Sequence, residues 1–193
     1  MNYSDLIKLL ERADRFRKKL NANNGEGTTW PFTFENGETH FYSIDKIKPA
    51  DEVEDELTSA FVWLWSLKDY VKKYAVSKGK SRDWVEVTVN ADPYLCVCAD
   101  IANSLKHGGL DRRSRSNKKL KLGSLKYNVP QEAMKEISIG AFDVNLNISN
   151  PSLVQLEMAV LSDDNKYIGD AFKYLDYSLK TWERIVSDAE NNV

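Results

Sequence analysis

Four polar residues recur at helical spacing in one stretch of the chain: Asp100, Asn103, Ser104 and His107. At 3.6 residues per turn they share one stripe of a predicted helix, while apolar side chains occupy the opposite arc. Asp and Asn are poor formers of helix interiors, because their short side chains compete for backbone hydrogen bonds. The stripe has three interpretations: a buried polar network in which Asp100 accepts and Asn103 bridges, a ligand-contacting surface, or a catalytic site.

The histidine of this stripe does not form a catalytic pair with its aspartate. Asp100 and His107 lie about 10 Å apart along the helix axis, and the sequence nominates no second titratable group for acid–base catalysis. At a helix C-terminus, the dipole would favour protonated His107 without any ligand. The other histidine, His40, stands among aromatic residues and is interpreted as a packed strand residue. We therefore predict no catalytic residue.

A basic segment follows the stripe directly. Between Lys106 and Lys126 the chain has eight Lys or Arg residues and one acid, a net charge of +7, which leaves −9 for the rest of a chain whose net charge is −2. A basic segment of this kind on an acidic protein indicates an anionic partner. Its Arg side chains stand among serines, a combination that suits phosphate oxygens. The alternative is a solvated loop whose charges keep it in water. The predicted ligand-binding residues are Asn103, His107, Arg112, Arg113, Arg115, Lys118 and Lys119.

Other motifs that carry chemistry are missing from the sequence. It has no Walker loop, no Gly-x-Gly-x-x-Gly, no Cys-x-x-Cys, no His-Glu-x-x-His and no Gly-x-Ser-x-Gly. Cys96 and Cys98 are one residue apart, which makes a mutual disulfide in a helix awkward, and the histidines add no zinc-ligand spacing. We interpret both thiols as buried and free, and we predict no metal and no cofactor.

The helices that must position these residues are predicted from apolar spacing and capping signals. A two-residue Asn-Gly turn between aromatic segments predicts a β-hairpin. Residues 84–89 are rich in β-formers, so a strand is the alternative for this ambiguous segment, but we favour a helix. The predicted elements are a helix at 4–20, a hairpin with strands 32–34 and 40–42 around Asn36-Gly37, a long helix from Pro49 to about Val76 closed by Gly79, a short helix at 81–89, and the stripe-bearing helix from Asp92-Pro93 to His107, capped by Gly108.

The second half of the chain changes to the two-residue period of strands. The parity of its apolar positions switches at Gly140-Ala141, which predicts a β-bulge, because an extra residue would keep one face buried. Asp170 is predicted to cap a last helix. The predicted strands lie around 120–127, 137–139, 144–148 and 154–160, with a turn at 163–165.

The composition is that of a folded protein. A length of 193 residues, 42% hydrophobic and 29% charged, suffices for one domain with its own core. No apolar run approaches the ~20 residues that span a bilayer, and the first residues lack the layout of a secretion signal. We expect a single cytoplasmic domain at 1–193 of the α+β class, a helical bundle half packed with a small antiparallel β-sheet and a C-terminal helix.

The motif Asp100-Ile-Ala-Asn103-Ser-Leu-Lys106-His107 resembles a helix of small uncharacterised bacterial and phage proteins whose C-terminal part is β-rich. It also resembles, more distantly, the HEPN-like superfamily of helical bundles, which includes RNA-cutting toxins. Those nucleases carry an Arg shortly before a His. The corresponding positions here hold Asp100, Ile101 and Ala102. The resemblance implies a role in phage defence or counter-defence.

These observations favour a non-catalytic cytosolic binding protein that captures an anionic partner, either a nucleotide-like small molecule or RNA. The alternatives are a HEPN-like ribonuclease toxin and a protein–protein inhibitor that uses its acidic remainder. We expect no membrane partner. A homodimer is possible, because two of the five tryptophans could mark a dimer face.

Overall fold

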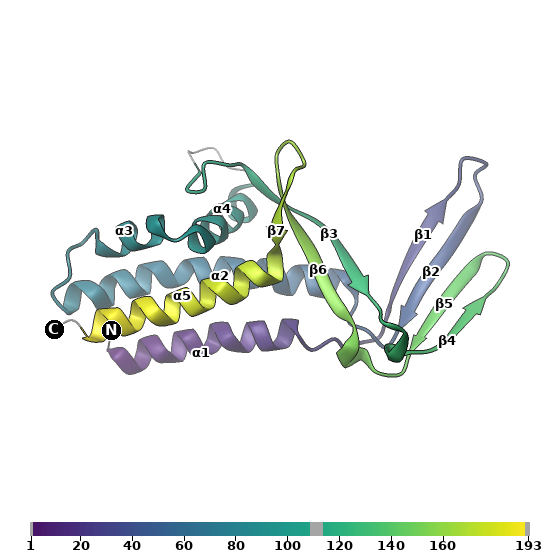
Figure 1. Cartoon of the computed structure of the whole chain (residues 1–193), viewed down its shortest axis with the longest axis horizontal. Coiled ribbons are helices and arrows are strands. Elements are labelled where there is room, and N and C mark those ends of the chain that lie inside the picture. The colour runs from purple at the N-terminus through teal and green to yellow at the C-terminus, as the bar shows by residue number, and fades with distance from the viewer. Residues whose placement is uncertain (1, 109–113, 192–193) are drawn as a thin grey trace. The chain divides into compact units, whose positions relative to one another are not determined.

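The computed structural model describes residues 2–108 and 114–191 and confirms the α+β class (Figure 1). By its internal contacts the chain divides into two compact units. Unit 1 contains the described residues of 1–19, 56–124 and 158–193, and unit 2 contains residues 20–55 and 125–157. The helices belong mainly to unit 1, whereas unit 2 is built mainly from strands.

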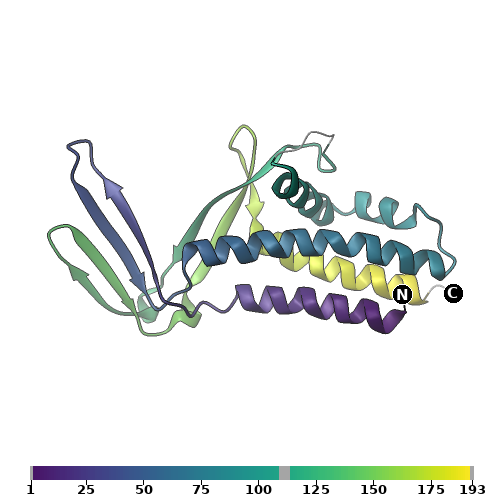
Figure 2. The same ribbon diagram turned by 180° about the vertical axis from the view of Figure 1, so that it is seen from behind.

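Unit 1 is a helical body whose apolar stripes face a shared core. The largest fully buried side chains come from several helices and include Phe61, Leu95 and Trp182. Ring contacts join Tyr3 to Tyr74 across a centroid distance of 6.1 Å. The long helices of this body lie side by side (Figure 2). The helices are α1 (Tyr3–Leu20), α2 (Ala50–Ser77), α3 (Trp84–Ala91), α4 (Pro93–His107) and α5 (Ala171–Asn191).

Capping residues set the helix ends at the predicted places. The Asp92 carboxylate accepts a hydrogen bond from the Leu95 backbone N–H at 2.9 Å at the start of α4, and Gly108 ends α4 with φ at +67°. The Asp170 carboxylate accepts one from the Lys173 N–H at 3.0 Å at the start of α5. The ambiguous segment is a helix, as favoured, and its β-branched Val85 and Val89 are buried.

The strands form two sheets. One has the order β3-β6-β7, and the other has the order β1-β2-β5-β4. Within the second sheet β2 and β5 run parallel, whereas β1 with β2 and β4 with β5 are antiparallel. The sheet is therefore two hairpins joined along their inner strands. The strands are β1 (Thr28–Thr33), β2 (Thr39–Asp45), β3 (Leu120–Asn128), β4 (Met134–Ile139), β5 (Asp143–Ile148), β6 (Gln155–Ser162) and β7 (Tyr167–Asp170).

The bulge predicted at Gly140-Ala141 is wrong. Those residues lie in the turn of the β4–β5 hairpin, where Ile139 pairs with Val144. A hairpin turn reverses the chain. The odd-numbered apolar residues of β4 and the even-numbered apolar residues of β5 therefore face the same side of the sheet without an extra residue. The prediction also assumed that this region is buried, whereas Ile137 and Ile139 are 55% and 79% exposed.

Candidate functional site

Asp100 is the buried centre of a hydrogen-bonded network in unit 1. Its side chain is 1% exposed and accepts from the backbone N–H groups of Arg115 and Ser116, each at 2.8 Å. The Ser116 hydroxyl donates to the same carboxylate at 2.6 Å. Hydrogen bonds to an ionised acceptor are among the stronger ones in proteins. Asp100 therefore fixes the basic segment against α4.

The side chain of Arg115 continues the network toward α3. Its guanidinium donates to the Glu86 carboxylate at 2.8 Å and to the side-chain oxygen of Asn90. It also lies over the Trp65 ring, with 4.9 Å between its central carbon and the ring centroid. Of the residues predicted to bind phosphate, Arg115 is thus already engaged within the protein.

Glu86 is the shared anion of this network. Besides Arg115, its carboxylate lies 3.2 Å from the Lys68 ammonium and 3.4 Å from that of Lys72, both on α2. Burial raises the pKa of Glu86, but the hydrogen bonds from Arg115 and Lys68 outweigh it and lower the pKa to about 2. Glu86 is therefore ionised at neutral pH and acts as a structural counter-charge.

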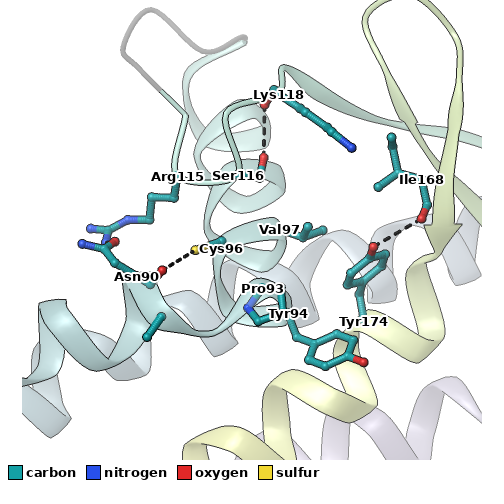
Figure 3. A pocket seen from close by; sticks show the side chains of 11 residues that line it. Asn90, Pro93, Tyr94, Cys96, Val97, Arg115, Ser116, Lys118, Ile168 and Tyr174 are labelled. Atoms are coloured by element: carbon teal, nitrogen blue, oxygen red, sulfur yellow. Dashed lines mark hydrogen bonds between the residues drawn. The ribbon is translucent and has the colours of Figure 1, made fainter.

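A pocket of about 490 Å³ lies beside this network, within unit 1 (Figure 3). In the figure Lys118 extends toward Ile168, above Tyr174, while Arg115 turns toward Asn90 on the far side. No carboxylate or imidazole is among the described residues that line the pocket. Its walls are Asn90, Ala91, Pro93, Tyr94, Cys96, Val97, Arg115, Ser116, Lys118, Ile168 and Tyr174.

Tyrosine rings from α4 and α5 form one wall. Tyr94 stacks on Tyr177 with a centroid distance of 4.5 Å and contacts Tyr174 at 6.0 Å. The Tyr174 hydroxyl donates to the Ile168 carbonyl at 3.4 Å, and burial raises its pKa, so it remains a neutral phenol. A Cβ at Gly169 would lie 2.7 Å from the Tyr174 ring. The glycine therefore allows the ring to pack closely against β7.

The cysteine at the back of the pocket is not activated. Cys96 and Cys98 are free and buried, as predicted, and the Cys96 thiol donates to the Val89 carbonyl at 3.5 Å. Burial and the nearby Asp100 carboxylate raise the pKa of Cys96. A raised pKa keeps the thiol protonated, which disfavours nucleophilic chemistry.

The other predicted site residues lie in different places. Lys118 is exposed and lines both the pocket and a second hollow of about 470 Å³ beside the 163–165 turn, whereas Lys119 lines the second hollow and not the pocket. Asn103 is half-buried and His107 exposed in the last turns of α4, and neither is among the pocket's described lining residues. Within the described part of the chain, no hydrogen bond joins Asn103 to Asp100. Arg112 and Arg113 lie outside the described residues.

A second basic region was not selected from the sequence. Residues 68–82 hold six Lys or Arg residues and one acid, and a hollow of about 680 Å³ is lined by Lys72, Lys73 and Arg82 with Asp69 and Val76. The charge count was the available signal. Lys and Arg residues commonly occur at the C-terminal end of a helix, where they complement the helix dipole. The same charge count therefore also fits an ordinary helix end.

Comparisons with known proteins give no indication of function. No family model, no curated protein and no solved structure matches the chain significantly. In the described ranges there is no cluster of three or more His, Cys, Asp or Glu side chains arranged to hold a metal ion. None of the described helices has both the length and the apolar character needed to cross a membrane.

Proposed function

We propose that this chain is a non-catalytic binding protein for a nucleotide-like anion, held in the pocket between α4, β7 and the basic segment. The observation that carries the proposal is that tyrosine rings and the Lys118 ammonium line the same hollow. A volume of about 490 Å³ is within the range of small-molecule sites, about 300–1,000 Å³. The pocket thus offers a stacking surface and a cation to one ligand.

The aromatic wall suits a base. Tyr94 is 36% exposed, and its ring adjoins Tyr174, which lines the same pocket. Stacking of a base on an aromatic side chain contributes about 1–3 kcal/mol and tolerates any base. The Asn90 side-chain oxygen accepts from Arg115, and no hydrogen bond among the described residues uses its amide N–H groups. Those groups are therefore available to donate to the ligand.

The basic wall suits a phosphate. The Lys118 side chain forms no ion pair within the described residues, and it faces the pocket (Figure 3). The Arg115 guanidinium is engaged by Glu86, a carboxylate that it shares with Lys68 and Lys72, so it holds the wall in place. We therefore assign the main phosphate contact to Lys118. The absence of a carboxylate or imidazole from the described lining favours binding over acid–base catalysis.

A titration with AMP, ADP, GMP and cyclic AMP, followed by calorimetry and thermal unfolding, tests the proposal. We expect saturable binding that raises Tm. Lys118→Ala should weaken it about tenfold, the effect of losing about 1.4 kcal/mol, whereas Lys119→Ala, the neighbouring lysine outside the pocket, should change it less than about twofold. No binding at millimolar concentration of any nucleotide would contradict the proposal.

RNA is a second candidate ligand, because residues 68–82 form an additional basic surface. Binding of a fluorescent single-stranded oligonucleotide would then weaken steeply with salt. The double variant Lys73→Ala/Arg82→Ala should weaken RNA binding more than Lys118→Ala does. The opposite order would assign the anion to the tyrosine-lined pocket.

A HEPN-like ribonuclease remains the catalytic alternative, based on the sequence resemblance around Asp100 and His107. His107 is exposed at the end of α4, so a substrate could reach it. RNA cleavage that disappears in His107→Ala would replace the binding proposal with this one. A cytoplasmic location and a role in phage defence or counter-defence are further parts of the proposal, and they rest on the sequence alone.

A further inference from the structure

The four-stranded sheet of unit 2 has one apolar and one polar face. Side chains alternate along each strand, so the pairing register decides which residues share a face. The polar face carries Thr29, Thr33, Thr39, Ser43, Asp45, Glu136, Ser138, Asp143, Asn145 and Asn147, together with Pro31 and Phe41. The apolar face carries Trp30, Phe32, His40, Tyr42, Ile44, Met134, Ile137, Ile139, Val144, Leu146 and Ile148, with Thr28 as a polar member.

The apolar face is covered at one end and open at the other. Near the strand ends Ile44, Leu146 and Ile148 belong to a core cluster with Tyr127 and Val154. Toward the hairpin turns the side chains are exposed. The exposed fractions are 53% for Phe32, 40% for Phe34, 38% for Tyr42, 55% for Ile137, 79% for Ile139 and 52% for Phe142.

The exposed end is an organised surface. The rings of Phe32 and Phe34 meet at 4.8 Å, those of Phe34 and His40 at 4.8 Å, and those of His40 and Phe142 at 5.5 Å. This aromatic row connects the β1–β2 hairpin with the β4–β5 hairpin, the pair shown side by side in Figure 1. Exposed apolar patches of this extent mark interaction sites in folded proteins.

The edges of the sheet are protected, so its face is the surface available to a partner. Edge strand β1 has Pro31 at its centre, which removes a backbone donor and suits an edge. Edge strand β4 is irregular between Met134 and Glu136 and carries Lys135 next to Glu136. Irregularities and charges on an edge strand oppose pairing with another strand.

We propose that two copies of this chain associate through the apolar faces of their β1-β2-β5-β4 sheets. With large apolar side chains of about 150–250 Å² each, the exposed fractions amount to roughly 480–790 Å² per copy, which overlaps the ~600–1,000 Å² per partner of stable interfaces. A twofold dimer requires a self-complementary patch. This face has no Asp, Glu, Lys or Arg among its paired strand residues, and the carboxylate of Glu38, next to the β2 strand, lies 3.5 Å from His40 Nε2. Charge repulsion between two copies of this face is therefore small.

Sedimentation equilibrium of the full chain tests the dimer independently of the ligand pocket, which lies in unit 1. The wild-type protein should sediment with twice the 22.1 kDa mass of one chain. Phe32→Lys and Ile139→Lys each place a charge on the apolar face, and each should raise the dimer dissociation constant at least about thirtyfold, as at an interface hot spot. Because both side chains are more than half exposed, folding should be retained, and circular dichroism checks this.

Phe41→Lys is the matched control. Phe41 is an aromatic residue of the same sheet, 48% exposed, but it lies on the polar face and pairs in register with Asp143. This variant should remain dimeric, with a dissociation constant within about threefold of the wild type. A wild-type protein that is monomeric up to 100 µM, or a dimer that Phe41→Lys disrupts and the two face variants do not, would overturn the proposal.

Discussion

The basic segment of unit 1 and the sheet of unit 2 differ in whether their surface side chains have partners within the protein. In the segment, Asp100 and Glu86 bind the backbone and side chain of Arg115, so an apparently available cation is engaged internally. In the sheet, large apolar side chains such as Ile139 are exposed. Residue type alone therefore does not identify a free surface, because the partner of each group decides whether that group is available.

Removal of the Asp100 carboxylate, which holds the basic segment of unit 1, should cause the largest loss in the free energy of unfolding. Asp100→Ala leaves two backbone N–H groups and a hydroxyl without their acceptor, and hydrogen bonds to charged groups contribute about 1.5–3 kcal/mol each. We expect a loss of about 2–4 kcal/mol in the free energy of unfolding by urea. Asp69→Ala, whose side chain is 74% exposed, is the control and should cost less than about 0.5 kcal/mol. Equal losses would show that Asp100 does not hold the segment.

Neutralising Glu86 should have the next largest effect. Glu86→Gln breaks the ion pairs with Arg115, Lys68 and Lys72 and should cost about 1–2 kcal/mol at pH 7, after allowance for solvent screening. The pKa of Glu86 is lowered from 4.5 to about 2 in the folded state. Its stabilisation is therefore present above pH 4.5 and is lost as the pH falls toward 2.

Urea unfolding between pH 2 and pH 7 measures this contribution. The wild-type free energy should fall with acidification more steeply than that of Glu86→Gln, so the two curves should converge near pH 2. Parallel curves over that range would contradict the role of Glu86 as the counter-charge of Arg115.

The tyrosine wall can be disturbed without changing any charge. Gly169→Ala places a methyl group 2.7 Å from the Tyr174 ring, so the ring must move, and overpacking of this kind costs about 1–3 kcal/mol. Nucleotide binding should weaken along with stability. Gly123→Ala, whose nearest contact is the flexible Leu161 side chain at 3.1 Å, is the comparison and should leave nucleotide binding unchanged. Unaltered binding in Gly169→Ala would remove Tyr174 from the site.

Charges on the exposed sheet face should have the smallest effect on folding. Ile139 is 79% exposed, so Ile139→Lys should change the unfolding free energy of the monomer by less than about 0.5 kcal/mol. The measurement requires a protein concentration low enough to dissociate any wild-type dimer. A loss of several kcal/mol would mean that this face is part of the core and would remove the contrast between the two units.

Local signals predicted the elements well. Capping by Asp92, Gly108 and Asp170 placed helix ends where the structure has them, and Asn36-Gly37 lies in the turn between β1 and β2. These signals act within a few residues, so the sequence displays them directly.

Contacts between distant residues were the part that the sequence could not provide. Arg115 meets Glu86 across 29 residues, and the pocket joins α4 to β7 and α5. The parity change at Gly140 was interpreted as a bulge because a buried face was assumed, whereas the face is open. Periodicity predicts that a face is apolar, but it does not show what covers that face.

The ligand site in unit 1 can be located by a titration of the ¹⁵N-labelled protein with AMP, followed by two-dimensional NMR of the backbone amides. We predict saturable shifts confined to the pocket, at the amides of Asn90, Tyr94, Ser116, Lys118 and Tyr174, with the sheet of unit 2 unchanged. Lys118→Ala should move the midpoint to a higher AMP concentration. Shifts that do not saturate at millimolar AMP, or that centre on the sheet face, would contradict the assignment of the ligand site.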